Sequence, residues 1–241
     1  MSSTSSGETA PVPKSVRNYT LAMLVLIYAS SHVDRQIVSI LAESIKLDLM
    51  LSDTQLGFLI GLSFALFYAT LGIPIAILAD RYSRRNIIAI SVVVWSAMTA
   101  FSGMAANYFQ LALARIGVGI GEAGSSPPSH SMISDLFPPE SRATAMGIYA
   151  TGINIGVLIG FLVGGWIDQW YGWRMAFFVV GIPGVILGLL MFFTVQEPAR
   201  SQPVKPLKLN IFSEVWDTFK LMMSIPSLRH IVIGCTLVVF V

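Results

Sequence analysis

The sequence predicts an all-α integral membrane protein, and three observations support this fold class. Hydrophobic residues make up 54% of the 241 residues and charged residues only 12%, whereas about a quarter of a soluble domain is charged. The apolar residues form long runs, and a helix of ~20 such residues spans the ~30 Å hydrocarbon core of a bilayer. The basic residues gather in short segments between these runs, a distribution that fixes the orientation of membrane proteins.

The apolar runs divide the chain into a tail, a bundle and a linker. A tail rich in Ser, Thr and Pro is expected to be disordered over residues 1–18, and a polar linker is expected at 196–226. Between them, residues 19–195 are expected to form a six-helix transmembrane bundle. A truncated seventh span is expected to start at 227–241. The six complete spans are predicted at 19–41, 56–79, 87–104, 108–136, 143–167 and 175–195.

The charges of the connecting loops predict the orientation. The loop after the second span carries Arg81, Arg84 and Arg85, and the segment after the sixth span is also basic, whereas the first, third and fifth loops are acidic, neutral or mixed. The N-terminus and the even-numbered loops are therefore expected in the cytoplasm, which for a bacterial protein means an inner (plasma) membrane location. A net charge of +2 gives no reason to expect a nucleic-acid partner.

Enzymatic motifs are absent from the sequence. It contains no nucleophile elbow, no His-Glu-x-x-His and no phosphate-binding Gly-Lys-Ser/Thr loop, and its single cysteine cannot form a disulfide within the chain. We therefore expect no catalytic residues, no metal and no cofactor. Function should instead lie with the few charged residues inside the spans, because burying a charge in lipid costs several kcal/mol unless it has a partner or a water-filled cavity.

Four such charges are candidates for proton coupling. Asp34 and Arg35 lie roughly 22 Å into the first span, and Arg115 and Glu122 lie roughly 12 and 22 Å into the antiparallel fourth span, at ~1.5 Å per residue. Asp34 and Arg115 are expected to pair, with Arg35 and Glu122 as the second base and acid. Moving an Arg away from a buried carboxylate changes its proton affinity, which couples protonation to conformation. The alternative is a static ion pair that only fixes helix packing.

The same charges are candidates for substrate binding, together with two neutral hydrogen-bonding groups from the second and fifth spans. The predicted substrate-binding residues are Arg35, Arg115, Glu122, Tyr68 and Asn154. The fifth span also carries Gly152, Gly156, Gly160 and Gly164 at intervals of four, a smooth stripe suited to tight packing or to sliding of a neighbouring helix.

The loop between the second and third spans carries a recognisable motif. Ala76, Asp80, Arg81, Ser83, Arg84 and Arg85 resemble the Gly-x-x-x-Asp-Arg-x-Gly-Arg-Arg motif of the major facilitator superfamily, with small residues at both glycine positions. The resemblance implies the N-terminal half of a 12-helix fold with 3+3 inverted repeats in each half. It also implies that Asp80 gates transport by pairing with a second six-helix bundle, and that Arg81, Arg84 and Arg85 complete the gating cluster.

A narrower resemblance is to the Spinster-like branch of this superfamily. It is carried by Val33-Asp34-Arg35, by Gly-Ile-Gly-Glu-Ala-Gly at 119–124 and by Ser-Asp-Leu-Phe-Pro at 134–138. It implies a secondary active transporter that works by alternating access, coupled to protons, with an amphipathic anionic substrate such as a lysolipid or sphingoid phosphate. The alternatives are a carrier of a small organic anion or drug, and a non-transporting half-length membrane scaffold.

Overall fold

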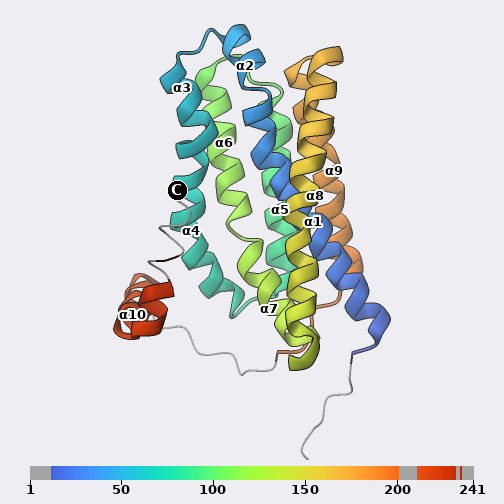
Figure 1. Cartoon of the computed structure of the whole chain (residues 1–241), viewed down its shortest axis with the longest axis vertical. Helices are drawn as coiled ribbons and strands as arrows, with labels where there is room; N and C mark the ends of the chain where they lie inside the picture. Colours follow the sequence, from blue (N-terminus) through green and yellow to red (C-terminus); the bar gives the residue numbers. More distant parts are fainter. Residues whose placement is uncertain (1–11, 201–210, 232–233, 235–241) are drawn as a thin grey trace, which may run out of the picture. The chain divides into compact units, whose positions relative to one another are not determined.

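The computed structural model describes residues 12–200, 211–231 and 234, and its regular elements over these residues are helices. The chain forms two units, residues 1–203 and 204–241. The first unit is a bundle of long, roughly parallel helices (Figure 1). The predicted all-α class and six-helix bundle are therefore confirmed.

Several members of the bundle consist of more than one helical segment. The second member, for example, contains a five-residue π-helical turn, Phe58–Leu62, ahead of its main segment. The elements in chain order are α1 (Lys14–Ile40), α2 (Ala42–Leu49), α3 (Asp53–Gly57), the π-helical turn, α4 (Ser63–Ala79), α5 (Arg84–Ser102), α6 (Tyr108–Glu122), α7 (Ser126–Leu136), α8 (Pro139–Tyr171) and α9 (Trp173–Thr194).

Local sequence determines where these helices begin. The side chains of Ser83 and Asn107 accept hydrogen bonds from the backbone N–H groups three residues later, capping α5 and α6. Pro139 occupies the first turn of α8, where a missing N–H costs nothing. Gly172 has a φ of 80° between α8 and α9, a conformation that glycine adopts without strain.

Four helical segments of the described chain are long and apolar enough to cross a membrane: Asp53–Ala79, Arg84–Ser102, Pro139–Tyr171 and Trp173–Thr194. The other two predicted spans do not meet this standard. Helix α1 carries the charged residues Asp34 and Arg35 in its apolar run, and the fourth member is divided into α6 and α7 by a break at residues 123–125. The two less apolar members are thus the ones that carry the predicted intramembrane charges.

The second unit adds a helix that the sequence analysis did not anticipate. Helix α10 (Ile211–Ser224) lies within the expected linker, and residues 226–231 are again helical. The rest of the expected seventh span, at 232–233 and 235–241, lies outside the described residues, as does the expected tail up to residue 11. Helix α1 begins at Lys14, ahead of the predicted start of the first span.

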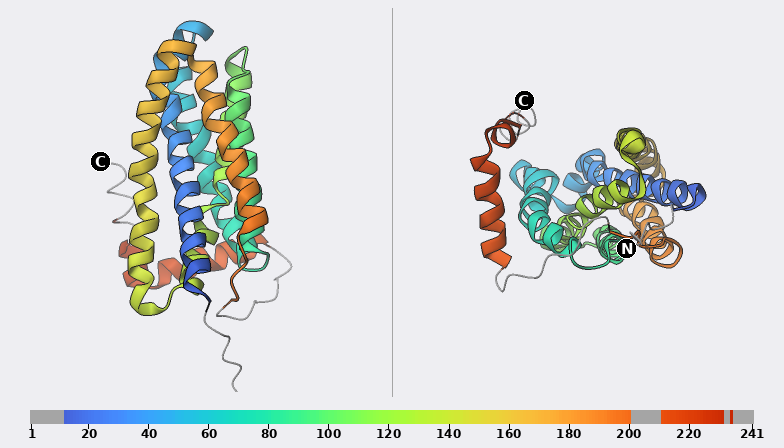
Figure 2. Two further views of the ribbon diagram at one scale, coloured as in Figure 1. Left: turned by 90° about the vertical axis from the view of Figure 1, so that its right-hand side faces the viewer. Right: turned by 90° about the horizontal axis from the view of Figure 1, so that it is seen from below.

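Within the bundle, α1 packs along α8, and α5 lies between α6 and α9 (Figure 2). The glycines of α8 allow the first contact: a Cβ at Gly152 would lie 3.0 Å from the Val25 carbonyl oxygen, and one at Gly164 only 2.7 Å from Ile37 Cδ1. The predicted smooth stripe is therefore the face on which α1 packs. Trp95, completely buried on α5, joins the core between these helices.

Candidate functional site

The four predicted charges of α1 and α6 meet inside the bundle. Asp34 and Glu122 are completely inaccessible, Arg115 is 1% exposed, and only Arg35 reaches the surface, with 28% of its side chain exposed. None of the four is placed on an open outer face. Helices α1 and α6 meet here through the long side chains of Arg35 and Arg115.

Arg35 and Glu122 form an ion pair. Arg35 Nε donates to Glu122 Oε2 at 2.7 Å, and the guanidinium carbon lies 5.0 Å from the ring centroid of Phe64 and 4.7 Å from that of Tyr68 on α4. Cations over aromatic faces are stabilised by ~0.5–2 kcal/mol. Tyr68, predicted as a substrate-binding residue, is thus part of the Arg35 environment.

Asp34 and Arg115 are close, but their side chains do not form the expected ion pair. Arg115 donates to the main-chain carbonyl of Asp34 at 3.4 Å. The Asp34 carboxylate instead accepts a hydrogen bond from the indole Nε1 of Trp95 on α5, at 3.1 Å. The physical reason is direction: the backbone at position 34 faces α6, whereas the side chain extends towards α5.

Trp95 is the residue that the sequence analysis missed. A tryptophan in an apolar run is interpreted as a core residue, and the sequence does not indicate which residue its indole N–H contacts. The available signal was chemical, because a buried indole N–H needs an acceptor. Asp34, a carboxylate expected inside the bundle, could supply that acceptor.

The charged cluster contains polar atoms that make no hydrogen bond to the described residues. Asp34 Oδ1, Glu122 Oε1 and Arg115 Nε are all buried and unpartnered. Such atoms are uncommon in folded proteins, where buried polar groups are nearly always hydrogen-bonded. Each carboxylate therefore has one oxygen held by the protein and one available.

Close backbone approach holds α6 in place around this cluster. A Cβ at Gly119 would lie 2.7 Å from the carbonyl oxygen of Phe64, and one at Gly121 would lie 2.7 Å from the backbone nitrogen of Trp95. Only glycine fits at these two positions without displacing α4 or α5. These two glycines thus let α6 approach the backbones of Phe64 on α4 and Trp95 on α5.

Asn154, the remaining predicted substrate-binding residue, is not brought to the cluster. It lies on an exposed face of α8 and makes no hydrogen bond within the described chain. A second group was not predicted: Tyr28 stacks on Tyr149 with centroids 4.3 Å apart, and His32 and His130 meet these rings edge-on at 4.6 and 5.3 Å. Three helices, α1, α7 and α8, supply this aromatic group.

The predicted gating arginines lie at the other end of α5. Arg84 is 1% exposed and donates to Asp135 at 2.5 Å, to Glu197 at 2.9 Å and to Ser131 at 2.9 Å. Its donors are therefore occupied inside the bundle. Asp80, by contrast, is exposed, and its carboxylate has no partner among the described residues.

Glu197 accepts hydrogen bonds from several of the groups around Arg84. It also accepts from the hydroxyl of Ser83 and the backbone N–H of Arg85, each at 2.8 Å. Burial disfavours the ionised form, but these hydrogen bonds and Arg84 outweigh it and lower the pKa of Glu197 from its ordinary value of 4.5. The Arg85 side chain turns to Asn86 instead. Arg81, the remaining predicted gating residue, lies half-buried in the same loop.

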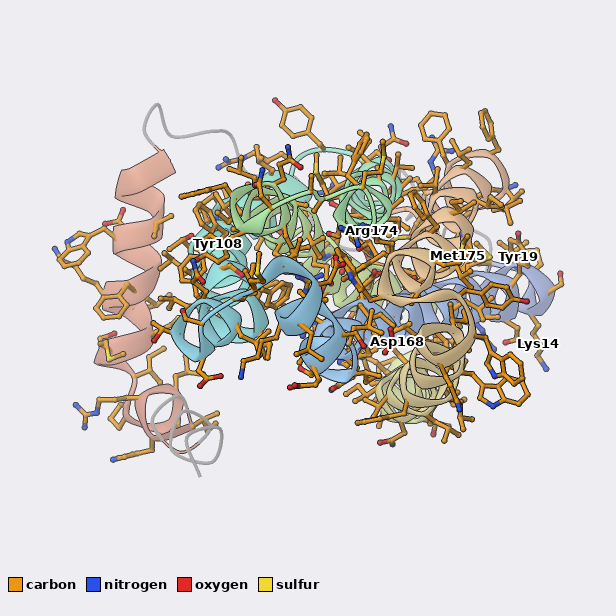
Figure 3. The ribbon with its side chains drawn as sticks, turned by 90° about the horizontal axis from the view of Figure 1, so that it is seen from above. Lys14, Tyr19, Tyr108, Asp168, Arg174 and Met175 are labelled. Atoms are coloured by element: carbon orange, nitrogen blue, oxygen red, sulfur yellow. The ribbon has the colours of Figure 1, made fainter. Side chains whose placement is uncertain are left out.

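At the opposite end of the bundle, the short helix α2 forms hydrogen bonds to α8 and α9. Figure 3 looks down on this end, where Asp168 and Arg174 lie at the adjoining ends of α8 and α9. Arg174 donates to Asp48 at 2.5 Å, and Ser44 donates to Asp168 at 2.5 Å. The hydrogen bond from Arg174 lowers the pKa of Asp48. The short helix α2 is thereby attached to both α8 and α9.

The chain is similar to several proteins of known sequence or structure. The crystal structure of a bacterial homologue of the human lysosomal transporter Spinster, inward-facing and unoccupied, matches with a TM-score of 0.75 and 38% identity over 87% of this chain and 50% of that one. An MFS-type efflux pump of Mycolicibacterium smegmatis is 36% identical over 81% of the chain and 46% of its own length. A hexuronate transporter of Bacillus subtilis is 32% identical over 73% and 42%.

The resemblance to Spinster-like proteins is therefore confirmed, and the chain spans about half the length of these relatives. Residues 24–241 match the family model of the Major Facilitator Superfamily. The helical bundle, the sequence motifs and this family match together show that the chain belongs to the major facilitator superfamily.

Proposed function

We propose that this chain is part of a proton-coupled secondary active transporter that works by alternating access and moves an amphipathic anion. The observation that carries the proposal is the Arg35–Glu122 pair, in which a buried acid holds a partly exposed base. Charged residues inside membrane spans that pair with one another commonly mark substrate pathways and proton relays in transporters.

The pair suggests how protonation and substrate binding are linked. Glu122 holds Arg35 through Oε2, while Oε1 is unpartnered. A proton added to Oε1 removes the negative charge that retains the guanidinium, which leaves Arg35 able to bind an anionic substrate. Loss of the proton restores the internal pair and displaces the substrate. Asp34 and Arg115, buried beside the pair, are the second acid and base of the proposal.

Alternating access requires a second bundle that rocks against this one. The exposed Asp80 at the end of α4 is the group in this chain suited to an interbundle contact, because its carboxylate is unpaired among the described residues. Arg84 has the different role of keeping the ends of α5, α7 and the segment after α9 together. The proposal places this end, and the N-terminus, in the cytoplasm, as the positions of the basic residues favour.

The substrate class follows from what surrounds Arg35. The guanidinium would bind a phosphate or carboxylate head group, and the flanking faces of Phe64 and Tyr68 suit an apolar portion. A lysolipid-like or sphingoid-like anion combines both features. A small organic anion is the second candidate, favoured by the similarity to a hexuronate transporter.

The test is uptake by the full-length protein in proteoliposomes, with sphingosine-1-phosphate and glucuronate as probes, with and without a pH gradient. Gradient-dependent movement of the sphingoid phosphate supports the proposal if it is lost in Arg35→Ala and Glu122→Gln but kept in the control Lys46→Ala, which removes a partly exposed cation of α2. Movement of glucuronate alone would transfer the assignment to the small-anion class. An uptake rate that is the same with and without the pH gradient would contradict proton coupling.

A further inference from the structure

The Asp34 carboxylate is held by a neutral donor in the core of the bundle. Trp95 Nε1 lies 3.1 Å from Asp34 Oδ2, and both residues are completely buried. The other oxygen, Oδ1, has no partner among the described residues. The two acids of the cluster are thus held differently, Glu122 by an arginine and Asp34 by an indole.

The helices on either side of α5 fix the position of its backbone at Trp95. On α6, Gly121 permits contact with the Trp95 backbone, because a Cβ there would lie 2.7 to 3.0 Å from the N, Cβ and Cα atoms of Trp95. On α9, Gly181 similarly admits α5, since its Cβ would lie 2.7 Å from the carbonyl oxygen of Ser96. Two close approaches therefore fix the backbone of α5 from which the indole extends.

The charged groups near Asp34 come from α1 and α6. Arg115 is the nearest cation, yet its guanidinium contacts the main-chain oxygen of residue 34 and not the carboxylate. Arg35 is engaged by Glu122. Helices α5 and α9 contribute no ionisable side chain at this level, because Arg84 and Arg174 lie at their ends. The indole N–H is the donor hydrogen-bonded to the Asp34 carboxylate, and the Thr99 hydroxyl, also on α5, is the other neutral polar group beside it.

We propose that Trp95 is a positioning residue for proton transfer at Asp34. By holding Oδ2, the indole leaves Oδ1 as the atom that gains a proton from water and returns it, and it keeps the carboxylate turned away from Arg115. The inference rests on the proposed proton coupling and adds to it the residue that selects the reacting oxygen. No covalent bond other than O–H forms or breaks.

The test is an infrared titration of the purified full-length protein without substrate. The carbonyl stretch of protonated Asp34 is identified as the band lost in Asp34→Asn, and its midpoint is followed with pH. In Trp95→Phe the ionised carboxylate loses its donor, so the midpoint should rise by about one pH unit, or tenfold in proton affinity. Trp166→Phe, which alters an indole that is 76% exposed on α8, should leave the midpoint unchanged.

A midpoint that stays in place in Trp95→Phe would overturn the positioning role while leaving proton coupling intact. Absence of any titrating Asp34 band in the unaltered protein would overturn both. If Trp95→Phe does not fold, the indole resonance of Trp95 in protein labelled with ¹⁵N at indole nitrogens gives the same answer. It should shift with pH in the unaltered protein and become insensitive to pH in Asp34→Asn, and a resonance that never shifts would overturn the inference.

Discussion

Arg35 Nε lies 2.7 Å from Glu122 Oε2, and the acid is completely buried while 28% of the arginine side chain is exposed. The asymmetry means that the base can leave the pair for solvent or substrate, whereas the acid cannot. A buried charge that loses its partner costs ~3–5 kcal/mol, because it stays in a low-dielectric environment. The two members of the pair should therefore respond differently to substitution.

Arg35→Ala should lower stability by ~3 kcal/mol, because it leaves Glu122 buried and unpaired. Glu122→Gln should cost less, since Arg35 keeps an amide oxygen as acceptor and can turn to solvent. Thermal unfolding of the purified full-length protein compares the two. Equal losses would show that the pair does not have the described asymmetry, and the double variant should recover part of the Arg35→Ala loss.

Gly156→Ala should destabilise the α1–α8 contact by ~2 kcal/mol. A Cβ at this position would lie 2.8 Å from His32 Cβ and 3.0 Å from the carbonyl carbon of Ala29, so the helices must move apart. Gly165, on the same helix, has no atom within 4 Å of its Cβ position. Gly165→Ala is the matched control, and it should be neutral or stabilising by up to ~1 kcal/mol. Similar unfolding temperatures for both variants would contradict the packing described.

Glu197→Gln should destabilise the protein by ~2 kcal/mol at neutral pH, because the ionised carboxylate accepts from Arg84, Ser83 and the Arg85 backbone. The native pKa of Glu197 lies below its ordinary value of 4.5. Its contribution is thus complete above pH 4.5 and is lost as the pH falls through the lower native value. The free energies of unfolding of the unaltered protein and of Glu197→Gln, measured across this pH range, should become more similar as the pH falls. A stability difference that increased in acid would contradict the lowered pKa of Glu197.

Arg84→Ala and Arg174→Ala should differ although each removes an arginine that bonds an aspartate. Arg84 is buried and serves several acceptors, so its loss should cost ~4 kcal/mol. The Arg174 and Asp48 side chains are 42% and 45% exposed, and such pairs contribute at most ~1 kcal/mol and are weakened by salt. Unfolding at low and high salt separates the two. A larger loss for Arg174→Ala would contradict this ranking.

Asp80→Asn should leave the stability of this bundle unchanged, because the exposed carboxylate has no partner among the described residues. Transport by the full-length protein should fall if Asp80 contacts a second bundle. The two measurements together distinguish an interbundle role from a structural one. Normal transport combined with lower stability would reverse the assignment.

Composition and periodicity predict most of the fold, since apolar runs of sufficient length have little alternative to membrane helices. Depth along the first and fourth spans predicts the pairing of Asp34 with Arg115, whereas the side-chain ion pair in the structure joins Arg35 and Glu122. Depth alone does not give the reach and direction of a long side chain. The Trp95–Asp34 hydrogen bond was not predictable either, because the direction of a side chain depends on helix rotation. The contact of Arg84 with Glu197, 113 residues apart, depends on tertiary packing for which the loop motif gives no register.

The π-helical turn Phe58–Leu62 has a consequence for the alignment of α4. Such a turn holds one residue more than an α-helical turn, and each residue of an α-helix corresponds to a rotation of about 100°. Deleting one amino acid from it would let the segment close into a regular α-helix and leave the rings at positions 64 and 68 over the guanidinium that they cover. The same deletion in the α-helical residue 63 that follows would instead turn both rings away from that guanidinium. The segment ahead of α4 should thus tolerate the loss of one residue at one place and not at the next, a difference of which composition alone gives no sign.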